Sequence, residues 1–209
     1  MRAWSFFTGF CRDQRGAGAA EFALVLPVVI LFLFGIIDVG LYGWKINKDE
    51  KATQMGTRMA VVTDPVAYGL VGQQYVGVNG LTQGDRIPAS ALGVVRCTST
   101  GTSCICDTAP CLTDMTKGSN GTAAFNAIVA RMQRVDPAIQ ASNVVVEYRG
   151  SGLGFAGDPA GPQISPLTTV RLQGMSFYPA TLMLFKSSIG LPSFSYTLTM
   201  EDGRGTMSN

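Results

Sequence analysis

Residues 15–40 read RGAGAAEFALVLPVVILFLFGIIDVG, and this stretch decides the fold of the chain. It contains sixteen residues without a charge, from Phe22 to Ile37. Extended to Trp44, the apolar run comes close to the ~20 residues that a helix needs to cross the hydrocarbon core of a bilayer. We therefore predict a single transmembrane helix over residues 17–44.

The charges before this helix indicate its orientation. Arg2, Arg12 and Arg15 precede the apolar run, against the single acid Asp13. Basic residues are retained on the cytoplasmic side of a membrane, so the amino terminus is expected in the cytoplasm and everything after Trp44 outside it. This predicts a single-pass protein of a bacterial inner membrane with a periplasmic carboxy-terminal domain.

The composition argues against several classes of function. The 209 residues carry a formal net charge of +2 and no basic stripe, so no nucleic-acid partner is expected. The chain has no histidine, which removes the commonest general base and metal ligand. It also shows no nucleophile elbow, phosphate-binding glycine loop or paired carboxylates. We predict no catalytic residue, cofactor, metal site or small-molecule substrate, and therefore no enzyme.

The helix is expected to continue beyond the membrane as a stalk over residues 45–64. Apolar residues recur along it at three- and four-residue spacing: Ala52, Met55, Met59 and Val62. Asp64-Pro65 ends the pattern, because a residue that precedes proline is pushed out of the helical region.

Residues 65–209 are predicted to form an α+β domain, with one further helix packed on an antiparallel sheet. An apolar stripe predicts that helix over residues 122–135. Strands are predicted at residues 93–96, 143–148, 168–178 and 193–200. The third of these changes parity at Gly174, as a β-bulge would produce, and residues 150–166 are expected to form a loop.

Four cysteines crowd into residues 97–111: Cys97, Cys104, Cys106 and Cys111. Zinc sites usually pair their ligands as Cys-x2-Cys, and that spacing is absent here. Two disulfides are the better interpretation if this loop lies in an oxidising compartment. The pairing stays open, except that Cys104 and Cys106 are not expected to bond to each other across one residue.

A dense apolar run spans residues 182–185. Such a run more often belongs to a buried core, but it could also dock on a partner or dip into lipid. The sequence leaves both possibilities open.

The residues next to the apolar helix also carry a family resemblance. The run from Arg15 to Phe22 resembles the processing site of type IV-like prepilins, with a basic leader, a glycine and a glutamate. The pair Glu21-Phe22 is more similar to Flp-type pilins than to other type IV pilins. The whole stretch over residues 15–40 looks like the opening of TadE and TadG proteins, and the chain length favours TadE.

The resemblance implies specific roles. Residues 1–16 would be a leader that prepilin peptidase removes after Gly16, which makes Ala17 the new amino terminus. Glu21 would then be the fifth mature residue, and its buried charge would pair with the amino group of a neighbouring subunit. Pro27 removes one backbone donor and would bend or loosen the helix, either as a feature of pilin packing or simply because membrane helices tolerate proline.

The resemblance implies a minor pilin or pseudopilin with a pilin-like domain, acting in Tad (Flp-type) pilus assembly and adhesion. Its expected partners are prepilin peptidase, other pilin-like subunits, the inner-membrane assembly platform and the lipid bilayer. The main alternative is a permanently anchored periplasmic binding or scaffold module that is never processed, in which Glu21 only marks the membrane interface.

Overall fold

The computed structural model describes residues 17–159, 162–182 and 187–200. Contacts divide the chain into two units. One unit joins the first part of the long helix, up to Trp44, to the segment Tyr178–Ile189. The other joins Lys45–Phe177 to the chain from Gly190 onwards. Each unit is described by itself.

The long helix α2 covers Ala17–Val62 and runs through Pro27. Its first half is apolar on every side and exposed, which is typical of a helix surrounded by lipid or by other apolar helices. Among the described helices, α2 is the one long and apolar enough to cross a membrane. A long apolar helix followed by an α+β domain confirms the predicted fold class.

The second half of α2 is buried along one side. Small residues four apart form the line of closest packing: Ala52, Gly56 and Ala60. A Cβ atom added at Gly56 would lie 2.7 Å from Cγ and Sδ of Met132 and 3.5 Å from Cγ1 of Val170. The helix therefore packs against both the second long helix and the sheet, because position 56 carries no side chain. Met55 and Val62, two of the expected apolar contacts, are only half-buried.

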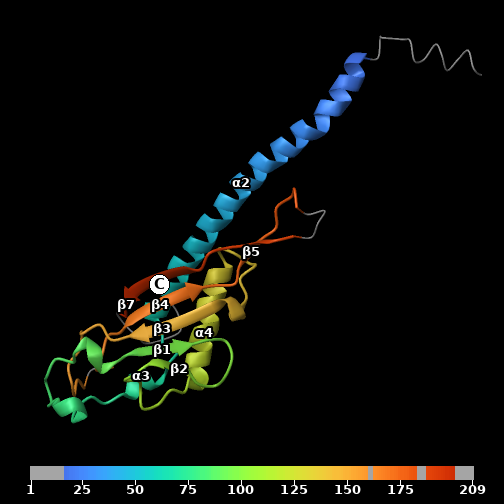
Figure 1. Ribbon diagram of the computed structural model, residues 1–209. Coiled ribbons are helices and arrows are strands. Elements are labelled where there is room, and N and C mark those ends of the chain that lie inside the picture. Colours follow the sequence, from blue (N-terminus) through green and yellow to red (C-terminus); the bar gives the residue numbers. More distant parts are fainter. Residues whose placement is uncertain (1–16, 160–161, 183–186, 201–209) are drawn as a thin grey trace, which may run out of the picture. The chain divides into compact units, whose positions relative to one another are not determined.

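The sheet of this unit has five strands in the order β2-β1-β3-β4-β7, and every neighbouring pair is antiparallel. In chain order, these strands are β1 (Val94–Cys97), β2 (Ile105–Thr108), β3 (Val144–Arg149), β4 (Leu167–Leu172) and β7 (Phe194–Thr199). Figure 1 shows them side by side with the helix α4 (Gly118–Gln133) next to them. The remaining elements are the short helix α3 (Gly69–Gly72), 3-10 turns at Val78–Gly80, Ala89–Ala91 and Ala141–Asn143, and the two-residue strands β5 (Ser176–Phe177) and β6 (Ile189–Gly190).

One face of the sheet forms the core. Tyr148 lies opposite Val95 and Thr168 in the register, and all three are buried. The hydroxyl oxygen of Tyr148 accepts a hydrogen bond from the N–H of Val66 at 2.8 Å, so the chain just after α2 is fixed to the central strand. A buried polar group of this kind needs its partner, because a lost hydrogen bond in the core leaves an uncompensated desolvation cost.

The opposite face carries a row of charges across four strands. Asp107 contacts Arg96 at 2.7 Å, Arg96 contacts Glu147 at 3.3 Å, and Glu147 contacts Arg171 at 3.2 Å. Alternating charges on neighbouring strands are favourable cross-strand pairs, each contributing up to about 1 kcal/mol. Ion pairs therefore stabilise this second face of the sheet, whereas apolar packing stabilises the core face.

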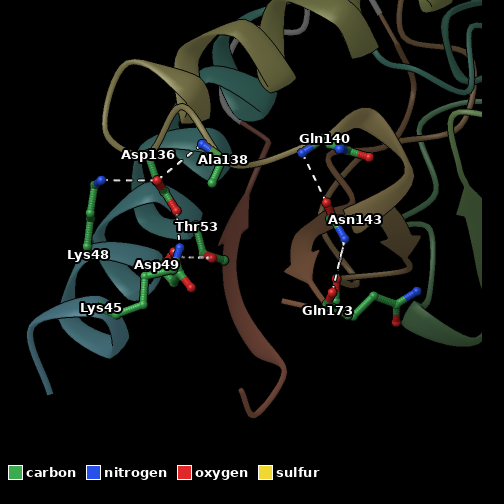
Figure 2. A network of polar contacts seen from close by, with 10 residues as sticks. Lys45, Lys48, Asp49, Thr53, Asp136, Ala138, Gln140, Asn143 and Gln173 are labelled. Atoms are coloured by element: carbon green, nitrogen blue, oxygen red, sulfur yellow. Dashed lines mark hydrogen bonds and ion pairs between the residues drawn. The ribbon is translucent and has the colours of Figure 1, made fainter. Parts of the chain in front are cut away.

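Three elements differ from the sequence prediction. Helix α4 begins at Gly118, four residues before the predicted start, in a Gly-Ser-Asn-Gly run that resembles a loop. Strand β2 was not predicted at all. The predicted strand over residues 168–178 is two strands, β4 and β5, because the chain turns at Gly174 with φ of +68°. Asn143 stabilises that turn by donating to the Gln173 carbonyl at 3.1 Å (Figure 2).

Gly121, in the first turn of α4, allows the helix to lie close to the chain that follows α2. A Cβ atom there would lie 2.2 Å from the carbonyl oxygen of Val66, a backbone atom that has no freedom to move aside. We predict that Gly121→Ala destabilises the protein by about 1–3 kcal/mol, although alanine is the better helix former. Urea unfolding of the detergent-solubilised chain would measure this change.

The matched control is Ser119→Ala, an exposed position in the same first turn, which should change the free energy of unfolding by less than about 0.5 kcal/mol. Equal stability of the two variants would contradict the close-contact explanation.

Candidate functional site

The residues predicted to function at the membrane lie at the beginning of α2. Gly16 lies outside the described residues, and Ala17 is the first residue of the helix. Glu21 and Phe22 are both exposed on its first turns. Among the described residues, no donor bonds the Glu21 carboxylate. The apolar surface that follows is available to lipid or to another helix.

This apolar surface continues over five turns of α2 and covers all sides of the helix. Its large exposed members are Phe22, Leu24, Val25, Leu26, Val28, Val29, Ile30, Leu31, Phe32, Leu33, Phe34, Ile36, Ile37, Val39 and Leu41. An exposed apolar patch of this extent marks a site of contact with a membrane or a partner. The first half of α2 is therefore the main candidate for an interaction surface.

Asp38 interrupts this surface on one side. Its carboxylate accepts three hydrogen bonds, from the N–H of Ala180 at 2.7 Å and from the N–H and hydroxyl of Thr181 at 2.9 and 2.6 Å. The side chain is only 7% exposed. Its partners begin 142 residues further along the chain, so no local pattern in the sequence indicates this contact.

A second polar cluster lies on the other half of α2, in the carboxy-terminal unit (Figure 2). Lys45 binds Asp49 at 2.9 Å and also contacts Asp136, just beyond the end of α4. Lys48 binds the other oxygen of Asp136 at 3.0 Å. Two lysines and two aspartates thus balance in charge, and they fix the end of α4 to α2. We call this group the Asp136 cluster.

The two acids of the Asp136 cluster have opposite pKa shifts. Burial raises the pKa of Asp49 to about 6, and the neighbouring carboxylate of Asp136 adds to the rise, although Lys45 opposes it. Burial alone would also raise the pKa of Asp136, but hydrogen bonds from Lys45 and Lys48 outweigh that effect and hold it below its ordinary value. Asp49 Oδ2 is buried and accepts no hydrogen bond from the described residues, so the ionised carboxylate is only partly compensated there.

The four cysteines lie in two pairs at disulfide distance. Cys97 pairs with Cys104 and Cys106 pairs with Cys111, with Cα–Cα distances of 4.4 and 5.8 Å. The first pair is buried, whereas Cys106 is exposed and Cys111 is half-buried. The two disulfides therefore differ in their access to solvent. Among the described residues, no group of His, Cys, Asp and Glu is placed to hold a metal ion.

A surface hollow of about 560 Å³ lies beside α3. Its lining includes Tyr68, Val71, Gln73, Gln74 and Asp114. A hydrogen bond from Thr113 N–H to the Gln73 side chain closes one side at 2.9 Å. The ionisable residues of its lining are Tyr68 and Asp114.

The pKa of Asp49 predicts a pH dependence of stability. Because the folded state holds this proton more tightly than the unfolded state, Asp49 stabilises the fold most below pH 4, and that contribution is lost as the pH rises through about 6. We predict that Asp49→Asn removes this decline, so the variant gains stability relative to the native chain between pH 4 and 7. Urea unfolding of the full chain in detergent at a series of pH values measures the difference.

Glu50→Gln is the control, because Glu50 is exposed on the same turn of α2. Its difference from the native chain should not vary with pH over this window. If the difference in unfolding free energy between Asp49→Asn and the native chain also does not vary with pH, burial does not raise the pKa of Asp49.

The unequal exposure of the disulfides gives a further prediction. A mild thiol reductant should reduce Cys106–Cys111 before Cys97–Cys104, because exchange requires access of the attacking thiolate. Alkylation followed by peptide mass analysis would identify which thiols are released first. Simultaneous release of all four would show that the domain must unfold before either bond is reached.

The amino-terminal segment is similar to a known protein family. Residues 16–58 match the family model described as TadE-like protein. No curated protein and no solved structure matches the chain. The matched residues begin at Gly16 and otherwise lie within α2, so they cover the exposed apolar surface, Asp38 and the α2 residues of the Asp136 cluster. Over this segment, the chain is similar to TadE-like proteins.

Proposed function

We propose that the protein is a pilin-like subunit, a minor pilin or pseudopilin, of a Tad (Flp-type) pilus assembly system. One observation carries this proposal: the TadE-like match begins at Gly16, the glycine at which a prepilin peptidase would cut, and α2 begins at the next residue. A peptidase at the membrane surface needs an unhindered backbone at the cleaved bond, which glycine supplies. The protein would act by assembly and not by catalysis.

The proposed topology has a cytoplasmic leader, an inner-membrane span over residues 17–44 and a periplasmic domain. The arginines of the leader support this orientation. The two disulfides also support it, because such bonds persist in oxidising compartments such as the periplasm. Its proposed partners are the prepilin peptidase, other pilin-like subunits and the assembly platform of the inner membrane.

Glu21 is the residue proposed to direct assembly. It lies four residues after Ala17, one turn into a helix whose next sixteen residues are uncharged. An ionised carboxylate at this depth is costly unless a partner neutralises it. The free amino group of Ala17 on a neighbouring subunit is suited to that role after cleavage. The pair would fix the register between two helices, which is the best-attested use of a buried ion pair.

Cleavage is the first test of this proposal. Removal of residues 1–16 takes away three arginines and one aspartate, so the formal charge falls from +2 to zero. We predict that intact-mass analysis of protein extracted from cells with an active prepilin peptidase finds Ala17 as the first residue. Gly16→Leu should block cleavage without preventing membrane insertion.

A chain that keeps its leader in such cells would instead be a permanent anchor. It would then fit the alternative function, a membrane-anchored binding or scaffold module.

Assembly is the second test. We predict that Glu21→Ala leaves cleavage, insertion and the disulfides intact but abolishes cross-links to other pilin-like subunits. Glu21→Gln should fall between the native chain and the alanine variant, because it keeps hydrogen bonding but loses the charge. Cross-linking on membranes, followed by immunoblotting, provides the measurement.

Glu50→Ala is the matched control, since Glu50 is an exposed glutamate of the same helix beyond the apolar surface. It should cross-link normally. If Glu21→Ala forms the same cross-links as the native chain, this carboxylate has no role in assembly and only marks the membrane interface.

A further inference from the structure

The segment Tyr178–Leu182 makes an unusual set of backbone hydrogen bonds, and we call it the Asp38 loop. The N–H groups of Ala180 and Thr181 donate to the Asp38 carboxylate. The N–H of Leu182 donates to the carbonyl of Pro179 at 3.2 Å, and proline itself has no N–H. Four successive residues outside any helix or strand therefore present no free donor.

A loop in water has no need of this arrangement, because solvent satisfies its backbone. In lipid, each unsatisfied backbone group costs several kcal/mol, and irregular segments are tolerated only where the protein supplies their partners. For the N–H groups of the Asp38 loop, the Asp38 carboxylate and the Pro179 carbonyl meet that condition. In return, its three donors satisfy a carboxylate that would otherwise be exposed to lipid.

The position of Asp38 along α2 places the loop at the edge of the hydrocarbon core. Ile36, Ile37 and Val39 are 56%, 52% and 73% exposed on the same turn of α2. Asp38 lies 21 residues after Ala17, which is about 32 Å along the helix axis, close to the ~30 Å thickness of the hydrocarbon core. A segment bonded directly to Asp38 therefore lies where the apolar surface of α2 ends.

Exposed aromatic groups occur in the same unit. Tyr178, at the beginning of the loop, is 69% exposed, and Trp44 is 62% exposed on α2. Tyrosine and tryptophan are the side chains most favoured at the level of the lipid headgroups.

We propose that the Asp38 loop is a second membrane-contacting element, seated in the interfacial layer of the bilayer, and that Asp38 holds it there. Its partner is the phospholipid interface itself, not a second protein. The proposal goes beyond the proposed function and depends only on α2 being inserted in a membrane, not on processing or pilus assembly.

Fluorescence quenching by brominated lipids tests the position of the loop. The full chain carrying Trp4→Phe and Trp44→Phe, with Tyr178→Trp as its only indole, would be reconstituted in phosphatidylcholine–phosphatidylglycerol vesicles. The lipids would be brominated near the glycerol end of their acyl chains. We expect the indole at position 178 to lose as much fluorescence as the native Trp44 does in a chain carrying Trp4→Phe alone.

The matched control places the single indole by Phe155→Trp, a position of similar exposure in the loop between β3 and β4. It should lose little fluorescence. If the indole at position 178 is quenched no more than the indole at position 155, the proposal is wrong. A protein partner for this loop would then be favoured. Quenching of Trp44 in its own variant shows separately that α2 is inserted.

Removal of the carboxylate tests the role of Asp38. In Asp38→Ala the N–H groups of the loop lose their acceptor and must find water, so the quenching at position 178 should fall towards the level of position 155. Asp38→Asn keeps one acceptor oxygen and should give an intermediate loss. Intact disulfides and unchanged Trp44 quenching in an Asp38→Ala chain that retains Trp44 would show that each variant is folded and inserted. Full quenching at position 178 in Asp38→Ala would overturn the holding role.

Discussion

Hydrocarbon supplies no hydrogen-bond partners, so the protein must satisfy every polar group that it places there. The first half of α2 does so by being an unbroken helix of apolar residues, whose backbone bonds are internal. Its two acids are treated differently. Asp38 is satisfied within the chain by three donors, whereas no described residue bonds Glu21. Asp38 therefore has its partners within the chain, whereas the proposed role in assembly would give Glu21 a partner on a neighbouring subunit.

The second half of α2 faces the opposite constraint, because it must bury one side against a domain. Small residues allow the close approach, and threonines on the buried side bond to carbonyls one turn earlier, as Thr53 does to Asp49 at 2.8 Å. Thr57 bonds in the same way to Thr53 at 2.9 Å and also lies 3.2 Å from the carbonyl oxygen of Tyr196 in β7. The Asp136 cluster adds a charged contact at the end of α4, where a proline ends the helical pattern. One continuous helix serves both environments because its side chains change while its backbone does not.

The sequence predicted those helices and strands whose position depends on a local hydrophobic pattern. The apolar run of α2 and the alternation of β7 were predicted to within a few residues, since hydrophobic periodicity determines both. The features that were missed depend on contacts between distant segments. The first turn of α4 lies against the backbone of Val66 through Gly121, and Asp38 is hydrogen-bonded by residues far along the chain. Disulfide pairing also follows from the pairing of β1 with β2, and the exposed residues of β2 carry no apolar alternation that would reveal a strand.

Strand β2 forms one edge of the sheet, and a sheet edge is a template on which another chain can add a strand. It is only four residues long, and it carries Ile105, which is 59% exposed. Both disulfides lie at this edge: one joins β1 to the residue before β2, and the other joins β2 to the chain beyond it. These bonds prevent β2 from lengthening or peeling away, so the edge is kept too short for sheet-to-sheet aggregation. The two disulfides thus protect this edge of the sheet from pairing with a strand of another chain.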